Sequence, residues 1–353
     1  MLEEWLASDV ISDPAKACLG GLAIGLAFGV FAQSSRFCLR SACLEFWKMN
    51  LGRSVVVWLM VFGAALTGAQ LLFLGGLIDA SEIRQLSTTG TLSGAIIGGL
   101  MFGIGMIMAR GCASRLLVLS GTGNMRALVT GLIVTVIAQA ALSGVLSPMR
   151  TALSGLWSVG PDARNLMLHM PEQSGLILGV ATLALAGWLA IREKLNPGSA
   201  LLAMALGATV ALGWGFTAGL SRISFSPVPV NSVSFTGPSA DTLMALITSP
   251  AMTLEFSLGL VPGVFAGSLI SALVRREFAL QVFDAQTGML RYLAGAVLMG
   301  FGGMLAGGCA VGAGVTGGSV MSLTAWVALF CMWIGAGLAI GLDSLKQPVS
   351  ATA

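Results

Sequence analysis

The sequence predicts an all-α integral membrane protein of about nine transmembrane helices and several short re-entrant helices, arranged as an inverted pseudo-two-fold repeat. Two of the three observations behind this prediction are the hydrophobic and the charged fractions of the composition. Of 353 residues, 56% are hydrophobic and 9% are charged, whereas a soluble domain carries about 25% charged residues. The chain therefore cannot cover its surface with charge, and its apolar runs of roughly 18–25 residues suit a bilayer core about 30 Å thick. The third observation is that the chain contains two similar halves.

Nine spanning segments can be placed in one membrane domain that covers residues 1–353. They lie at about 15–33, 54–78, 91–109, 125–146, 174–191, 199–216, 253–273, 290–307 and 322–341. Several contain glycine or alanine at spacings of three and four, as at Gly21, Gly25 and Gly29. Small residues let membrane helices approach closely, because lipid gives helices no hydrophobic reason to associate. We therefore expect a tightly packed bundle surrounded by membrane lipid.

The distribution of Lys and Arg predicts the orientation of the chain. With nine spans, thirteen of these residues fall in the loops on one side and five in the loops on the other. The positive-inside rule places the richer side in the cytoplasm, so the N-terminus is periplasmic and the C-terminus cytoplasmic. The acidic N-terminus also indicates a retained first helix rather than a cleaved signal. The small net charge of +3 gives no reason to expect nucleic acid as a partner.

The two similar halves are visible as matching residues at fixed offsets. At an offset of 197 positions the matches include Gly103/Gly300, Gly111/Gly308 and Cys112/Cys309, and at 186 they include Ser35/Ser221 and Arg36/Arg222. Repeat one then covers about 15–146 and repeat two about 199–342, with a linker helix at about 174–191. An odd number of linking spans turns the second repeat upside down, as in secondary transporters whose sites lie at the midplane where the repeats meet.

Four turns occupy equivalent places in the two repeats. They are Ser35–Cys38, Arg110–Cys112, Ser221–Ser224 and Gly307–Cys309. Each follows a span and precedes a stretch too short to cross the bilayer, at 39–49, 113–120, 241–247 and 310–319. Non-helical backbone at membrane depth is tolerated only inside protein or beside a cavity. We therefore expect re-entrant hairpins whose short helices direct their N-termini at one another, an arrangement that attracts an anion.

Three of these turns end in a cysteine, and Cys38, Cys112 and Cys309 are the predicted substrate path. A neutral thiol is a weak donor and a polarisable contact. Thiols in series could pass a sulfur-bearing anion without a deep trap, as conduction requires. The ordinary alternative is that cysteine serves as a small residue in tight packing. The cysteine spacings match no zinc or haem motif and the chain has one histidine, so we expect no metal, no cofactor and no catalytic residue.

Five further residues are secondary candidates for the path. They are Ser224, Arg36, Arg110, Arg222 and Cys43. The arginines could attract anions at a vestibule, or could instead anchor the hairpins to carbonyl groups or phospholipid. Ser224 stands where the other turns have cysteine, although its hydroxyl could simply satisfy a backbone carbonyl.

These turns resemble those of the YeeE/YedE family of bacterial inner-membrane proteins, the sulfur-transport family. The resemblance rests on F-A-Q-S-S-R-F-C, A-R-G-C-A-S-R and G-G-C-A-V-G-A-G, and it covers almost the whole chain. Characterised members are thiosulfate uptake proteins with three cysteines in a central path, which match Cys38, Cys112 and Cys309 here. The resemblance also implies an hourglass-shaped monomer and a cytosolic TusA-like sulfurtransferase as a separate partner chain. Other members are tied to selenium metabolism.

Three functions remain open on the sequence alone. The first is a permease for thiosulfate or a related small sulfur anion. The second is a membrane sulfurtransferase-like protein that carries sulfane sulfur as a cysteine persulfide, although no His, Asp or Glu adjoins the three cysteines in sequence. The third is a channel or scaffold in a larger assembly. Transport of a selenium compound is a variant of the first.

Overall fold

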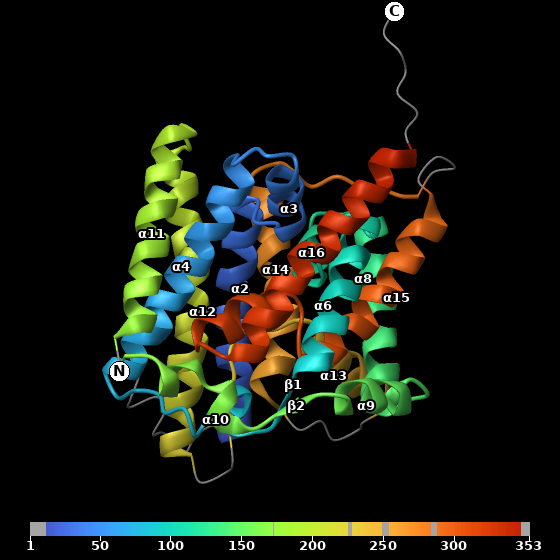
Figure 1. The fold of residues 1–353 in the computed structure, drawn as a ribbon. Coiled ribbons are helices and arrows are strands. Elements are labelled where there is room, and N and C mark those ends of the chain that lie inside the picture. The colour runs from blue at the N-terminus through green and yellow to red at the C-terminus, as the bar shows by residue number, and fades with distance from the viewer. Residues whose placement is uncertain (1–11, 172, 225–227, 249–253, 284–287, 347–353) are drawn as a thin grey trace, which may run out of the picture.

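The computed structural model describes residues 12–171, 173–224, 228–248, 254–283 and 288–346, and within these ranges it is an all-α membrane protein. Nine helical segments are long and apolar enough to cross a bilayer, at the nine predicted places (Figure 1). Their main helices are α2 Asp13–Ser35, α4 Arg53–Leu74, α6 Leu92–Met108, α8 Met125–Ser143, α11 Ser174–Arg192, α12 Pro197–Ile223, α14 Phe256–Val274, α15 Met289–Leu305 and α16 Leu323–Lys346. Both chain ends, whose sides the charge count predicts, lie outside the described residues.

Helix α12 extends furthest beyond its prediction, since it continues to Ile223 and not to 216. The additional turns contain polar residues, which end a hydropathy-based prediction too early. Thr217 is fully buried, and its hydroxyl donates to the carbonyl of Gly213 at 2.9 Å and to that of Asn231 at 2.7 Å. Because the hydroxyl is satisfied inside the protein, the helix continues through these residues.

Four short helical segments stand between the long ones. They are α3 Leu39–Trp47, α7 Ala113–Gly121, α13 Thr236–Thr248 and the π-helix η2 Ala310–Gly317. Three begin where the sequence predicted a short stretch. The fourth, α13, begins at Thr236 and not at 241, so the turn that leads into it differs from the predicted one.

The remaining elements lie together at one end of the bundle, the lower end in Figure 1. They are α5 Arg84–Ser87, β1 Gly90–Thr91, α9 Ser147–Gly155, β2 Ser158–Val159, α10 Pro161–Arg164 and η1 Leu166–His169. Strands β1 and β2 pair antiparallel, with Gly90 opposite Val159. Arg164 fastens this layer to the start of α16, because its Nε donates to the Thr324 hydroxyl at 3.0 Å.

The bundle is held together by helix pairs in close contact, of which α2 and α14 form the most extensive. Gly259 of α14 faces the backbone of α2 so closely that an added Cβ would come within 1.9 Å of the Cys18 carbonyl oxygen. Gly25 of α2 similarly faces the carbonyl of Leu260. Helix α6 packs on both α15 and α16, and α4 packs on α11 and α12. These contacts are the close approach that the small-residue spacing predicts.

Several elements recur at a constant separation along the chain. Helices α6 and α15 each have 17 residues and begin 197 positions apart, at Leu92 and Met289. The same 197 positions separate the first residues of α7 and η2, and of α3 and α13. The packing recurs too, since α7 packs on α8 and α14 as η2 packs on α16 and α4.

Candidate functional site

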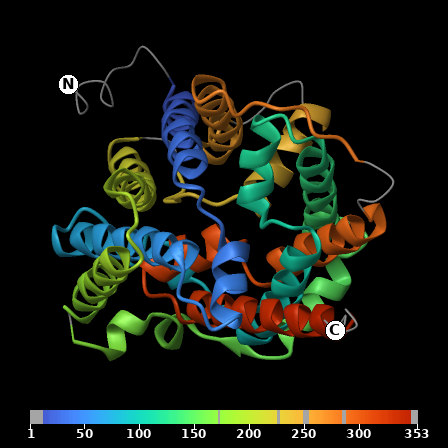
Figure 2. The same ribbon diagram turned by 90° about the horizontal axis from the view of Figure 1, so that it is seen from above.

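The turns before the short helices cross the interior of the molecule. Helix α2 packs on α14, but α3, which follows it, packs on α4 and α16. Helix α6 packs on α15 and α16, but α7, which follows it, packs on α14 and α8. Seen from above, the chain runs from α2 across the bundle to α3 (Figure 2). The connecting residues are therefore brought into the middle of the protein.

The three cysteine turns share one backbone conformation. Two residues before each cysteine the chain takes a positive φ, at Arg36 (55°), Arg110 (57°) and Gly307 (84°). This left-handed residue ends the preceding helix and redirects the chain. The cysteine itself is then extended and occupies the N-cap position of the short helix. The sequence predicted this placement of the cysteines.

All three thiols are buried, and Cys112 lies near both Cys38 and Cys309. Its Sγ lies 3.2 Å from the hydroxyl of Ser114 in the first turn of α7. The Sγ of Cys309 accepts a weak hydrogen bond from the amide of Gly312 at 3.4 Å. The structure therefore brings Cys38, Cys112 and Cys309 together, each at the start of its own short helix.

The remaining cysteines divide into one near this group and two apart from it. Cys43 is fully buried on α3 and lies near Cys38 and Cys112. Neither Cys18 nor Cys331 has a cysteine among the groups that affect its thiol. In the part of the chain that the structure describes, no three His, Cys, Asp or Glu residues are grouped so as to hold a metal ion.

The fourth turn differs from the predicted one. Ser224 follows the last residue of α12, and its hydroxyl donates to Asp13 Oδ2 at 2.7 Å. It does not precede α13, because eleven residues separate the end of α12 at Ile223 from Phe235, which immediately precedes α13. The residue that lies beside η2 is Ser234. A Cβ added to Gly312 would come within 2.2 Å of the Ser234 hydroxyl.

Sequence reasoning missed Ser234 because the repeat offset changes from 186 to 197 within this connection. The stretch 230–235, which contains Ser232 and Ser234, has no cysteine to mark it. In the structure its backbone is fixed against η2, since the Thr316 hydroxyl donates to the carbonyl of Val233 at 2.5 Å. The Ser232 hydroxyl is bonded to the carbonyl of Val210 at 2.6 Å. Of these two serines, Ser234 is the one that the hydrogen bonds leave for another partner.

The predicted arginines have different surroundings. Arg36 is exposed and its guanidinium lies 3.6 Å from Glu277. Arg110 is exposed and stacks over the ring of Tyr292, 5.9 Å from its centroid. Arg222 donates to the carbonyl of Gly76 at 3.0 Å and lies 3.8 Å from Glu82. Arg222 therefore holds α12 against the connection after α4, which agrees with the alternative that the arginines anchor the turns to carbonyl groups.

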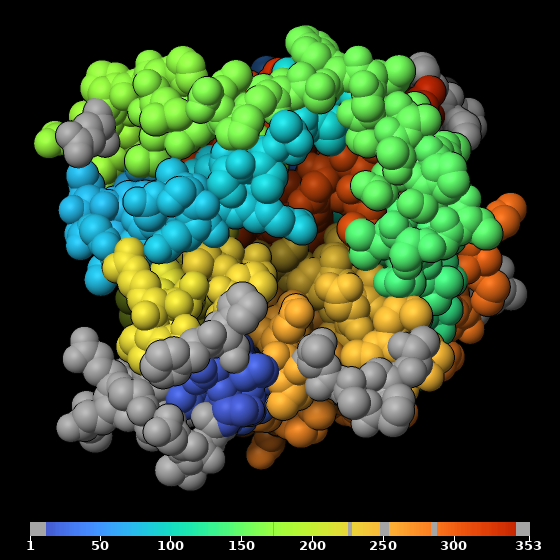
Figure 3. Space-filling view, turned by 90° about the horizontal axis from the view of Figure 1, so that it is seen from below, coloured from blue at the N-terminus to red at the C-terminus, as the bar shows by residue number. Residues whose placement is uncertain are grey.

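A hollow opens at the centre of the face opposite to that of Figure 2. Figure 3 shows it between the cyan and green segments of the first half and the gold and orange segments of the second. Red-orange residues, which follow position 300, lie at its floor. The end of α15, η2 and the start of α16 belong to this part of the chain.

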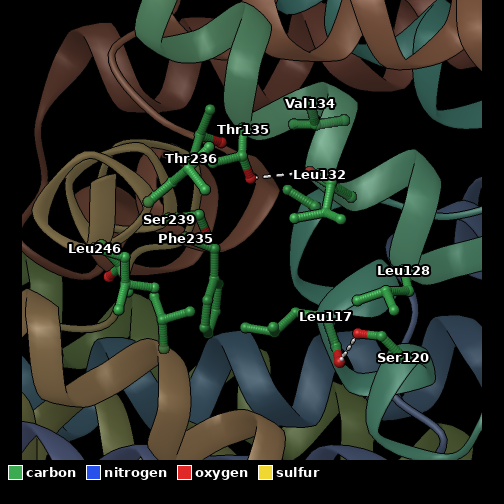
Figure 4. A pocket seen from close by; sticks show the side chains of 15 residues that line it. Leu117, Ser120, Leu128, Leu132, Val134, Thr135, Phe235, Thr236, Ser239 and Leu246 are labelled. Atoms are coloured by element: carbon green, nitrogen blue, oxygen red, sulfur yellow. Dashed lines mark hydrogen bonds between the residues drawn. The ribbon is translucent and has the colours of Figure 1, made fainter. Parts of the chain in front are cut away.

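A separate cavity of about 160 Å³ lies beside the thiols, between α7, α8, α13 and α14 (Figure 4). Ala113 and Phe235, which border the cysteine turns, form part of its wall. Most of the wall is apolar, with hydroxyls from Thr135, Thr236 and Ser239. None of the three cysteines lines it. On the corresponding side of the bundle, rings of α4 and α16 contact one another, namely those of Trp58, Phe62, Trp326 and Trp333.

Comparison with known proteins gives a consistent result. Residues 34–338 match the profile of the family described as Sulphur transport. The chain is 26% identical over 343 residues to the thiosulfate transporter TsuA of Escherichia coli, which covers 90% of this chain and 92% of the relative. It is 28% identical over 334 residues to the thiosulfate transporter TsuA of Spirochaeta thermophila, with 89% and 96% covered.

Proposed function

Since the chain belongs to the sulphur transport family, we propose that it is a permease for the uptake of thiosulfate or a related small sulfur-containing anion. Both relatives are named as transporters of thiosulfate. The observation that carries the proposal is that the buried thiol of Cys112 lies near both Cys38 and Cys309. Cysteines in adjacent positions at three helix N-termini are suited to a small anion that contains sulfur.

The path that we propose runs between two inverted repeats. The common separation of 197 positions between α3 and α13, α6 and α15, and α7 and η2 supports the repeat. Helix α11 has no counterpart in this pattern and lies between the two halves in the sequence. A re-entrant path for α2 and α3 is supported by length, because their 35 residues would extend about 52 Å as one helix, well beyond a bilayer core of about 30 Å.

Movement along the path would be a series of weak contacts. A thiol donates a weak hydrogen bond, and the free amides at a helix N-terminus donate more. The anion would pass from the Cys309 turn to Cys112 and then to Cys38. No single contact is strong enough to retain it, which is the requirement for rapid passage.

The proposed location is the bacterial inner membrane, with the N-terminus in the periplasm and the C-terminus in the cytoplasm. The hollow of Figure 3 would then face the periplasm, and the turns that contain Arg36 and Arg110 would face the cytoplasm. We propose a TusA-like sulfurtransferase as the separate cytosolic chain that consumes the imported sulfur. Consumption inside would remove the anion and so draw further uptake.

Growth tests the proposed function directly. A bacterium that lacks its own sulfate and thiosulfate uptake should grow on thiosulfate as sole sulfur source only when it expresses this protein. A Cys38→Ala, Cys112→Ala, Cys309→Ala triple variant, present in the membrane at the same level, should not support growth. Growth on sulfite but not on thiosulfate would reassign the substrate, as would uptake of labelled selenite without uptake of thiosulfate.

Doubly labelled thiosulfate distinguishes a permease from a persulfide carrier. If the anion crosses intact, both sulfur atoms enter proteoliposomes in equal amounts. Entry of the sulfane sulfur alone, with a labelled persulfide on the protein, would contradict the permease and support a membrane sulfurtransferase.

A further inference from the structure

Arg40 is a partly buried guanidinium beside the thiols that has no acidic partner. It lies in the first turn of α3, two residues after Cys38, which is the N-cap residue of that helix. Its Nε is buried and has no hydrogen-bond partner. Within the described residues, no carboxylate lies within ion-pair distance of Arg40 or of Arg110.

The charged neighbours of Arg40 increase the need for an anion. Its electrostatic neighbours include the guanidinium groups of Arg110 and Arg291. Arg291 is paired with Asp343, whereas Arg110 contacts only the ring of Tyr292. A partly buried charge without a counter-ion is costly, because desolvation is not repaid by an ion pair. An anion that joins the two guanidinium groups would offset this cost.

The opposite end of the cysteine group lacks this charge. At the offset of 197 positions Arg40 corresponds to Gly237 in the first turn of α13, and Arg110 corresponds to Gly307 before Cys309. Arg110 and Gly307 even share the left-handed conformation, with φ of 57° and 84°. The fold itself therefore does not require arginine at either position. Of the two matched pairs of positions, the first repeat has arginine and the second has glycine.

We propose that Arg40 and Arg110 form an anion-binding site at the Cys38 end of the cysteine group, suited to a divalent sulfur oxyanion such as thiosulfate. The site rests on the proposed function for its ligand. The two guanidinium groups donate charge-assisted hydrogen bonds to the oxyanion end, while the Cys38 thiol contacts the sulfane sulfur. Because Arg110 is exposed and Arg40 is only partly buried, water reaches the site and the anion can leave.

Flux measurements with thiosulfate test the site. In proteoliposomes the Arg40→Gln variant should require about ten to a hundred times more thiosulfate for half-maximal uptake, because it loses a hydrogen bond between charged groups. Arg40→Lys keeps the charge without the planar fork and should lie between the variant and the wild type. Arg53→Gln removes an exposed positive charge at the start of α4 and is the matched control, expected to behave like the wild type.

Thermal melting in detergent separates an anion site from a structural role. Without ligand, Arg40→Gln should melt at or above the wild-type temperature, since the guanidinium has no partner to lose. Thiosulfate should raise the melting temperature of the wild type but not of the variant. A lower melting temperature of the ligand-free variant, or an unchanged half-maximal concentration, would overturn the site. If the wild type moves no thiosulfate, the proposed function fails, and the ligand-dependent melting shift still decides whether the site exists.

Discussion

Among the three thiols of the proposed path, Cys112 is the one that lies near both of the others. We expect Cys112→Ala to reduce thiosulfate uptake at least a hundred-fold, because the remaining thiols, Cys38 and Cys309, lose the group between them. Folding should be little affected, since alanine is only slightly smaller than cysteine. Uptake by whole cells at matched expression measures the effect. Cys331→Ala, at a buried cysteine apart from the group, is the control and should retain uptake.

Ser234 offers a second test at the level of single residues. If its hydroxyl is the polar group of the fourth turn, Ser234→Ala should lower the apparent affinity for thiosulfate several-fold, because one hydrogen bond contributes about 0.5–1.5 kcal/mol. Ser224→Ala removes a hydroxyl bonded to Asp13 and should leave the affinity unchanged. Concentration dependence of uptake provides both values. A larger loss in Ser224→Ala would show that the path passes the end of α12 instead.

The sequence could predict the cysteine positions but not their polar neighbours. Cysteine follows a left-handed residue in three turns, and the Gly-rich or Arg-containing pattern marks each turn in the sequence. Arg40 could not be singled out, because its charged neighbours Arg110 and Arg291 lie more than fifty residues away along the chain. Ser234 was missed for a different reason, since the longer connection before α13 displaces the fourth turn from its expected position.

Among the secondary-structure elements, the α2–α14 pair makes a prediction about stability. Gly259→Ala would place a methyl group 1.9 Å from the backbone carbonyl of Cys18, which cannot rotate away. The helices must separate, and overpacking of this kind costs about 1–3 kcal/mol. Gly187→Ala in α11 has no atom within 4 Å of the new methyl group and should be neutral or stabilising, by up to about 1 kcal/mol. Thermal melting of the purified variants compares the two, and equal melting temperatures would contradict the close contact.

The short helices show where prediction from pattern is weakest. The stretch before Ser319 was expected as a short helix, and its start at Ala310 is confirmed. Its π-helical form could not be predicted, since hydropathy and glycine content do not separate helix types. Tertiary contacts determine it, because Gly312 and Gly317 leave room for Ser234 and for Ala325. Helix type at such a position depends on neighbours that are distant in sequence.

For the molecule as a whole, the charge of the substrate determines how uptake responds to membrane potential. Each negative charge that moves inward against an inside-negative potential costs about 2.3 kcal/mol per 100 mV, so a dianion costs about 4.6 kcal/mol. Without coupling, accumulation of thiosulfate in vesicles should fall by about three orders of magnitude when 100 mV, inside negative, is imposed. Labelled thiosulfate in vesicles with a potassium gradient and valinomycin measures this, and Cys112→Ala vesicles report leakage. Accumulation that ignores the potential would mean that two cations enter with each anion.

The division of contacts between the two halves has a consequence for biosynthesis. The principal partner of α2 is α14, and those of α6 are α15 and α16, so the first half finds its main contacts in the second half. The ribosome completes α2 through α9 before any of these partners exists. Until the second half is made, the glycine-containing faces of α2 and α6 are therefore exposed to lipid. A nascent chain that stops after α11 has the α4–α11 contact but lacks the main partners of α2 and α6, and quality-control proteases should remove it.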